Sequence, residues 1–248
     1  MVLEVEVGFA IAVLGLSGCI LFLFDRNLQA RPAPWAGFFL GAFLYIIIHD
    51  TTDALLLEPA VRLAYGLPSS LLLAVVGLLL GGGSVSLLLR EPSGTDRDWT
   101  TVLLFVAIVL ALHAALDGIV IAETLRWLAE EEILQPAAIA LQVIHRALEG
   151  GVIVALMLMA RVGKLRIFAV TFYVGLPTVA TAAWVPVAPQ ESLWAMSIFF
   201  ALVEFGAFLV LLLVGLWPLL SQSGRRVDVA RWALGGFLLT LLAHALAH

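Results

Sequence analysis

The stretch "ALHAALDGIVIAE", Ala111 to Glu123, places a histidine and an aspartate four residues apart inside an otherwise apolar run. The stretch "VIHRALEGGVIVAL", Val143 to Leu156, repeats this spacing with a glutamate in place of the aspartate. Residues four apart lie on the same face of a helix, one turn from each other. Each run therefore predicts a helix that directs an imidazole and a carboxylate toward one point.

The composition around these runs indicates an integral protein of the cell membrane. Of the 248 residues, 62% are hydrophobic and only 12% are charged, and the mean hydropathy is +1.09. Soluble domains carry about 25% charged residues, so a water-soluble core could not bury this much apolar surface. In such a protein the net charge of −5 says little about nucleic acid, but nothing in the sequence resembles a basic groove, so we expect no nucleic acid partner. The single cysteine, Cys19, excludes an intramolecular disulfide and a CxxC metal site.

The apolar runs predict an all-α, polytopic protein with a single transmembrane domain over residues 1–248. A membrane-spanning helix needs about 20 mostly apolar residues. Eight segments meet this requirement: 4–24, 35–57, 67–89, 100–126, 136–160, 165–186, 192–217 and 228–247.

The positive charges predict the orientation of these spans. Most of the 13 Lys and Arg residues lie at alternate connections: Arg26, Arg31, Arg90, Arg97, Arg161, Lys164, Arg166, Arg225, Arg226 and Arg231. Cytoplasmic loops of membrane proteins carry such an excess of positive charge. We therefore expect the basic connections in the cytoplasm and both termini on the opposite, extracytoplasmic side.

The two histidine–acid pairs predict a metal site inside the membrane, formed by His113, Asp117, His145 and Glu149. An ionisable side chain in the bilayer costs about 2.5–3.5 kcal/mol on insertion scales, so such residues mark function by default. Nitrogen and oxygen donors in a group of four suit Zn²⁺. Fe²⁺, Mn²⁺ and Cd²⁺ stay open, because ligand type alone rarely fixes the metal.

The expected packing of the two spans supports this site. Segments 100–126 and 136–160 are joined by a short connection, which predicts antiparallel neighbours. Gly118, Gly150 and Gly151 directly follow the two acids, and we expect them to let these two helices approach each other closely.

The motifs "HAALDG" and "HRALEGG" resemble the fourth and fifth helices of the ZIP family of divalent-metal transporters. The run "GAFLYIIIHDTTDAL" resembles the second helix of that family, and "GKLRIFAVTFYVGLPTVATAAW" resembles its basic loop and proline-containing sixth helix. The resemblance implies an eight-helix transporter, not an enzyme, with both termini outside and metal moving toward the cytoplasm.

Three positions depart from the family pattern, in which two metals are often bound. Ala114 stands in place of an asparagine, Arg146 in place of an acid, and Thr178 lies near the position of a missing glutamate. The resemblance therefore implies one retained metal site. We expect the guanidinium of Arg146 to take the place of the second cation and to pair with Asp117 or Glu149.

Other polar residues allow two interpretations each. His49, Asp50 and Asp53, near the outer end of segment 35–57, are either a first contact for the incoming ion or interfacial side chains that reach toward water. Glu204 in "FALVEFGAF" is either a relay group or a hydrogen-bonded structural acid, and the structural role is favoured.

Two other functions stay open. In an intramembrane zinc hydrolase, the metal would be held by His49, Asp53, His244 and His248, with Ser84 or Ser86 nearby. A transporter-like metal-binding protein that no longer transports is the other, suggested by Arg146. The expected partners are the lipid bilayer and a divalent metal ion, and the sequence leaves a homodimer open.

Overall fold

The computed structural model describes residues 31–56, 67–88, 99–130, 136–185, 190–222 and 225–247. Within these ranges the regular structure is entirely helical. The helices are α3 (Pro32–Leu56), α5 (Leu67–Leu88), α6 (Trp99–Glu130), α7 (Pro136–Met159), α8 (Lys164–Trp184), α9 (Gln190–Val210), the π-helix η2 (Leu211–Leu216), α10 (Trp217–Gln222) and α11 (Arg226–Ala247).

Five stretches of the described chain are long and apolar enough to cross a membrane: Pro32–Asp53, Trp99–Ala122, Lys164–Trp184, Met196–Leu220 and Arg226–Ala245. The prediction of an all-α membrane protein is thereby confirmed. The predicted span 4–24 lies outside the described residues. The total of eight spans and the orientation of the termini stay predictions.

The observed helices follow the predicted segments with small shifts at their ends, except near residue 217. There the helix predicted over 192–217 continues through η2 into α10, which ends at Gln222. Pro218 has no backbone N–H to donate and crowds the preceding turn, and a wider π-turn is one way in which a helix accommodates such a residue.

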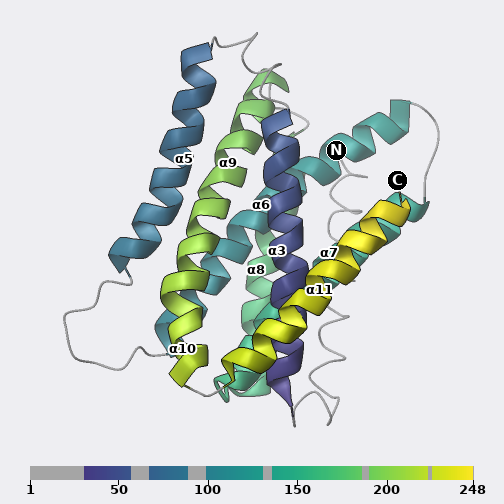
Figure 1. Ribbon diagram of the computed structural model, residues 1–248. Helices are drawn as coiled ribbons and strands as arrows, with labels where there is room; N and C mark the ends of the chain where they lie inside the picture. Colours follow the sequence, from purple (N-terminus) through teal and green to yellow (C-terminus); the bar gives the residue numbers. More distant parts are fainter. Residues whose placement is uncertain are drawn as a thin grey trace.

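The helices form a bundle whose closest contacts are between pairs of helices (Figure 1). Extensive contacts join α3 to α11, α5 to α9 and α6 to α8, and α3 also lies against α7 and α9. Side chains such as Phe43, Leu110 and Leu156 form the buried core between these helices. By contrast, α6 and α7 contact each other only lightly, although they are consecutive.

The expectation that Gly118 and Gly151 bring α6 and α7 together is wrong, and for Gly150 it stays a prediction. A Cβ on Gly118 would collide with Thr181 Oγ1 and with the carbonyl of Thr178, both on α8. A Cβ on Gly151 would meet the ring of Phe39 on α3. The glycines therefore allow close contacts with α8 and α3, and long side chains span the gap between α6 and α7.

A tight turn joins α7 to α8. The N–H of Arg161 donates to Leu158 O and the N–H of Val162 donates to Met157 O, which is the hydrogen-bond pattern of a Schellman motif. Arg161 takes the left-handed conformation, with φ of 58°. This turn fixes α8 antiparallel to α7 and sets Thr178 at the depth of the polar residues of α7.

The outer face of α11 is apolar. Large hydrophobic side chains are exposed along this helix, among them Trp232, Leu234, Leu238 and Leu242. Exposed apolar side chains on a long helix are expected where it meets lipid tails instead of water. This surface indicates contact with the lipid bilayer.

Candidate metal centre

Charged and polar side chains from five helices meet in the interior of the bundle. Asp50 comes from α3, His113 and Asp117 from α6, His145, Arg146 and Glu149 from α7, Thr178 from α8 and Glu204 from α9. Most of them are less than 6% exposed; Asp50 and His145 are more accessible. Buried charge on this scale is costly unless the groups compensate one another or hold an ion.

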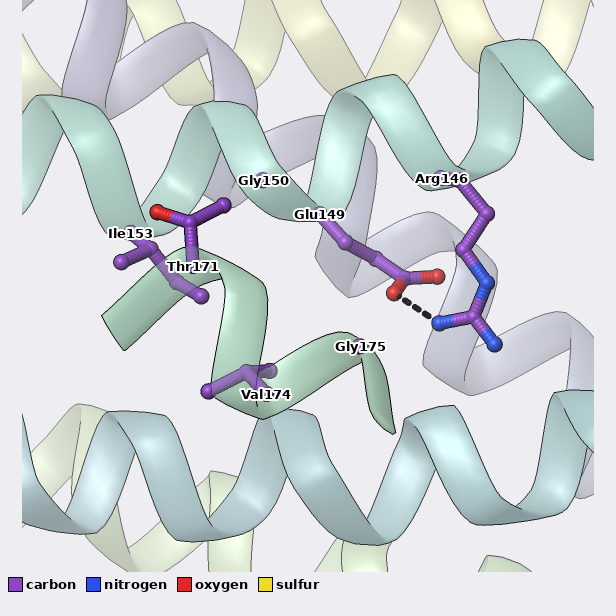
Figure 2. Close-up of a pocket in the computed structure, with 7 residues that line it drawn as sticks. All are labelled: Arg146, Glu149, Gly150, Ile153, Thr171, Val174 and Gly175. Atoms are coloured by element: carbon purple, nitrogen blue, oxygen red, sulfur yellow. Dashed lines mark hydrogen bonds and ion pairs between the residues drawn. The ribbon is translucent and has the colours of Figure 1, made fainter. Parts of the chain in front are cut away.

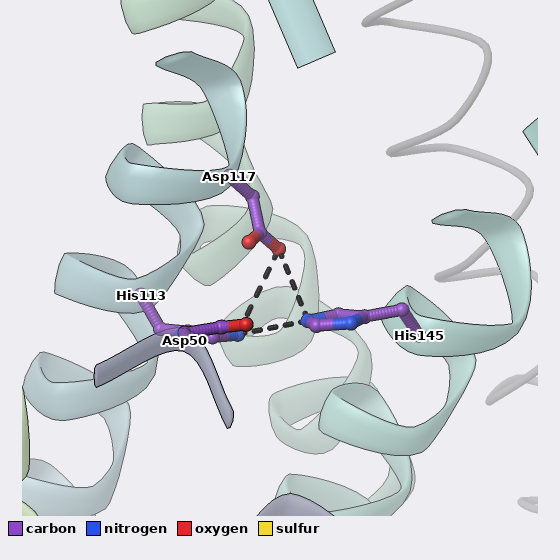
Figure 3. A group of neighbouring side chains, drawn as sticks. All are labelled: Asp50, His113, Asp117 and His145. Atoms are coloured by element: carbon purple, nitrogen blue, oxygen red, sulfur yellow. Dashed lines mark hydrogen bonds and ion pairs between the residues drawn. The ribbon is translucent and has the colours of Figure 1, made fainter. Parts of the chain in front are cut away.

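The two histidines predicted to meet lie edge to edge (Figure 3). The Nε2 atoms of His113 and His145 are 2.9 Å apart. The ring planes differ by only 6° and the ring centroids are 5.2 Å apart, so the rings meet through these nitrogens instead of stacking. At this distance one imidazole donates a proton to the other, or both direct lone pairs at a shared cation.

Asp117 completes a triangle of donor atoms with the two histidines. Its Oδ2 lies 3.7 Å from His113 Nε2 and 3.4 Å from His145 Nε2. Tetrahedral zinc with bonds of about 2.0–2.2 Å places neighbouring ligand atoms about 3.3 Å apart. The three observed distances lie within about 0.4 Å of this spacing, so the donor set fits a zinc-sized ion.

Asp50 of α3 is the fourth residue of this group of donor atoms. Asp50, His113, Asp117 and His145 each offer one ligand atom, and these atoms lie within 4.8 Å of one another. The sequence interpretation grouped Asp50 with His49 at the outer end of the helix and missed this position. A signal was present, because Asp50 follows the buried residues Phe43 and Ile46 at helical spacing, on the inward face of α3.

Glu149, the fourth predicted ligand, divides its oxygens between two partners. Its Oε1 lies 3.2 Å from His113 Nε2 and 3.0 Å from His145 Nε2, whereas its Oε2 accepts from Arg146. Asp117 Oδ2 and Glu149 Oε1 are buried and have no hydrogen bond within the described part of the chain. Both atoms face the imidazoles, as ligand atoms would, although Asp117 Oδ2 also lies 2.9 Å from Nη2 of Arg146. The metal-binding role of Glu149 stays a prediction.

The side chain of Arg146 on α7 contacts residues of α6, α7 and α8. Its guanidinium pairs with Glu149 and, at 2.9 Å, with Asp117. It also donates to Thr178 Oγ1 at 2.7 Å and to Ala114 O at 3.2 Å. The expectation that Arg146 pairs with Asp117 or Glu149 is confirmed, and it pairs with both. A fixed positive charge therefore lies directly beside the cluster.

A small cavity adjoins this ion pair (Figure 2). It has a volume of about 20 Å³ and is lined by Arg146, Glu149, Gly150, Ile153, Thr171, Val174 and Gly175. That volume holds about one water molecule. Because Ile153 follows Glu149 and Thr171 precedes Thr178, the cavity lies on the side of the cluster nearer the basic α7–α8 turn.

Glu204 contacts the other nitrogen of His113. Its Oε1 lies 2.9 Å from His113 Nδ1, and both side chains are buried. The ring of Phe43 meets the same imidazole at 89°, with centroids 5.1 Å apart. Glu204 has no histidine or acid one turn away on its own helix, so no residue spacing indicates this pairing.

His49 and His244 meet at the contact of α3 and α11, with ring centroids 4.2 Å apart. The hydrolase alternative requires this proximity. It also expects Ser84 or Ser86 nearby, and that expectation is wrong. Both serines belong to α5, which packs on α9, and Figure 1 draws α5 and α11 on opposite sides of the bundle. His248 lies outside the described residues.

Comparisons with known proteins add no relative, because neither a family model nor a curated protein matches the chain. The resemblance to the ZIP family therefore rests on the quoted motifs alone. Fold and site together describe a helical membrane protein with a buried His/Asp cluster that could hold a metal ion.

Proposed function

We propose that the protein is a divalent-metal transporter of the ZIP type, best suited to Zn²⁺, that moves the ion toward the cytoplasm. One observation carries the proposal. His113 Nε2, His145 Nε2 and Asp117 Oδ2 come from two helices and lie 2.9–3.7 Å apart inside the bundle. This spacing suits the ligands of a tetrahedral ion.

The charge of the cluster supports a divalent cargo. Asp50, Asp117, Glu149 and Glu204 contribute four carboxylates, and Arg146 contributes one positive charge. With neutral imidazoles and ionised acids, the formal charge is −3. Buried charges need compensation, and a divalent ion would reduce this value to −1.

The ion pairs of Arg146 support the binding of one metal ion, and not two, in the buried cluster. Its guanidinium bridges Asp117 and Glu149, the acids that would otherwise share a second metal. Each acid receives one nitrogen of the same guanidinium, Nη2 at Asp117 and Nη1 at Glu149, so one fixed positive charge partly neutralises both carboxylates without a second ion. We therefore expect one ion in the buried cluster.

The surroundings of the cluster support a direction of movement. His145 and Asp50 are 18% and 27% exposed, which gives the cluster partial access away from the basic turn. Toward that turn, the ion pairs of Arg146 and the small cavity adjoin the site. The positive charges of the turn predict that it faces the cytoplasm, so an inward-moving ion passes Arg146.

Zinc uptake into proteoliposomes tests the proposal. His113→Ala and Glu149→Ala each remove a donor, and we expect both variants to lose uptake. Asp228→Ala, which removes an exposed acid in the first turn of α11, is the matched control and should retain uptake. Unchanged uptake in both site variants would reject the proposal.

A metal-binding protein without transport is the second candidate, and the ion pairs of Arg146 favour it. A guanidinium held by α6, α7 and α8 could keep the site closed toward the cytoplasm. Zinc binding by the wild-type protein without any uptake would support this function over transport.

A further inference from the structure

The contact between α3 and α11 places two histidines together near the ends of both helices. The rings of His49 and His244 lie at 65° to each other, with centroids 4.2 Å apart. Tyr45 packs against both rings. The described part of the chain therefore has a second histidine pair, on helices other than those of the buried pair.

Close backbone packing fixes this arrangement. A Cβ on Gly41 would collide with the backbone of Ala233, and a Cβ on Gly236 would collide with the backbone of Phe38. Glycines on both helices thus let α3 and α11 approach until their backbones touch. The position of His244 beside His49 follows from this packing and not from a flexible surface.

Two carboxylates lie beside this histidine pair. His49 Nδ1 is 3.4 Å from Asp53 Oδ2 and 3.6 Å from Asp50 Oδ1. The His49 and Asp53 side chains are 30% and 58% exposed, and Asp53 is the last residue of the candidate span Pro32–Asp53, where a span meets the aqueous interface. Imidazole nitrogens and carboxylate oxygens with open access to water make a donor set for a labile divalent ion.

Asp50 connects this group to the buried cluster. Its Oδ1 faces His49, and its Oδ2 lies 4.0 Å from His113 Nδ1. One carboxylate therefore lies between the accessible histidine pair and the buried one.

We propose that His49, Asp53 and His244 form a second divalent-cation site, the outer site, and that Asp50 is shared between it and the buried cluster. The outer site binds more weakly than the buried cluster, because its ligands are partly hydrated and have to close around the ion. If the protein transports metal, as proposed above, the outer site is where the ion first binds before Asp50 passes it to the buried cluster. This role rests on the proposed function, whereas the site itself does not.

Zinc titration of the full chain in lipid nanodiscs, with a competing chromophoric chelator, tests the outer site. We expect two equivalents for the wild-type protein. His244→Leu removes an outer donor and should leave one tight equivalent. Leu241→Ala, an exposed apolar position on the same helix, is the matched control and should retain two.

The double variant His113→Ala/His145→Ala separates the two sites. It should lose the tight equivalent and keep the weak one, which His244→Leu then removes. One equivalent in the wild type, lost in the double variant and untouched by His244→Leu, would overturn the outer site and leave the proposed function standing. Two equivalents with uptake unaffected by the double variant would support the outer site and reject the proposed function.

A chemical probe covers the case in which His244→Leu fails to fold. Cys19 is the single cysteine of the chain, so a Cys19→Ser background is free of thiols. In that background, His49→Cys/His244→Cys should bind Cd²⁺ and be protected from alkylation, with either single variant as control. Alkylation unaffected by Cd²⁺ would overturn the proposed proximity of the two donors.

Discussion

Glu204 Oε1 on α9 lies 2.9 Å from Nδ1 of His113 on α6, while the other nitrogen of the same ring faces His145. A carboxylate at one imidazole nitrogen favours the proton there and leaves the other nitrogen with a free lone pair for a metal. We therefore expect Glu204 to act as a positioning residue for His113.

Replacing Glu204 should weaken zinc binding without removing a ligand. We expect Glu204→Leu to reduce zinc affinity about 10–100-fold, the usual effect of losing a partner that orients a metal-binding histidine. Glu204→Gln, which can accept from Nδ1, should retain more affinity. Chelator competition measures both, with the exposed Asp228→Asn as control. Wild-type affinity in Glu204→Leu would show that His113 needs no such partner.

Replacing Arg146 should destabilise the metal-free protein. Arg146→Ala leaves Asp117 and Glu149 buried without their cation, and losing one partner of a buried pair costs about 3–5 kcal/mol. Added zinc should restore stability more than in the wild type, and the buried cluster should accept one more ion. Thermal unfolding with and without zinc measures the first effect, and equilibrium binding measures the second.

The control for Arg146 is Arg166→Ala, an exposed arginine at the start of α8, which should leave stability and stoichiometry unchanged. A metal-free Arg146→Ala protein as stable as the wild type would contradict the role of the guanidinium as a substitute cation.

Gly118→Ala should destabilise the contact of α6 with α8. The new methyl group would overlap Thr181 Oγ1 and the carbonyl of Thr178, and overpacking of this kind costs about 1–3 kcal/mol. Gly235→Ala on α11 meets nothing within 4 Å and should be neutral or slightly stabilising, since alanine favours a helix over glycine. Equal unfolding temperatures for the two variants would argue against the observed approach of α6 and α8.

Zinc binding should weaken in acid. Each imidazole must be unprotonated to bind, so protons compete with the metal near pH 6.5, where free histidine takes up a proton. Affinity should fall by up to about tenfold per pH unit for each imidazole that has to release a proton. Titration at several pH values should give a steep slope for the wild type and a shallower one for His145→Ala. Equal slopes would mean that His145 is not a ligand.

The spacing of histidines and acids predicted which residues of α6 and α7 belong to the buried cluster. His113 with Asp117, and His145 with Glu149, are each one helical turn apart, so local geometry alone aims each pair at one point. The pairing of Arg146 with the acids was also predictable, because a buried guanidinium has few other ways to be satisfied. Asp50 and Glu204 come from separate helices, and no spacing within the sequence relates them to His113.

Residue order alone is enough to predict that the chain forms long apolar helices and which residues share a helix face. Both properties follow from composition and the 3.6-residue period. Which helices touch becomes clear only from the folded chain, in which Gly118 packs against α8, Gly151 packs against α3 and His244 contacts His49. The physical reason is that helix contacts inside a bilayer depend on close packing of small residues between surfaces that are apolar on every side. Hydrophobic patterning cannot distinguish one such surface from another.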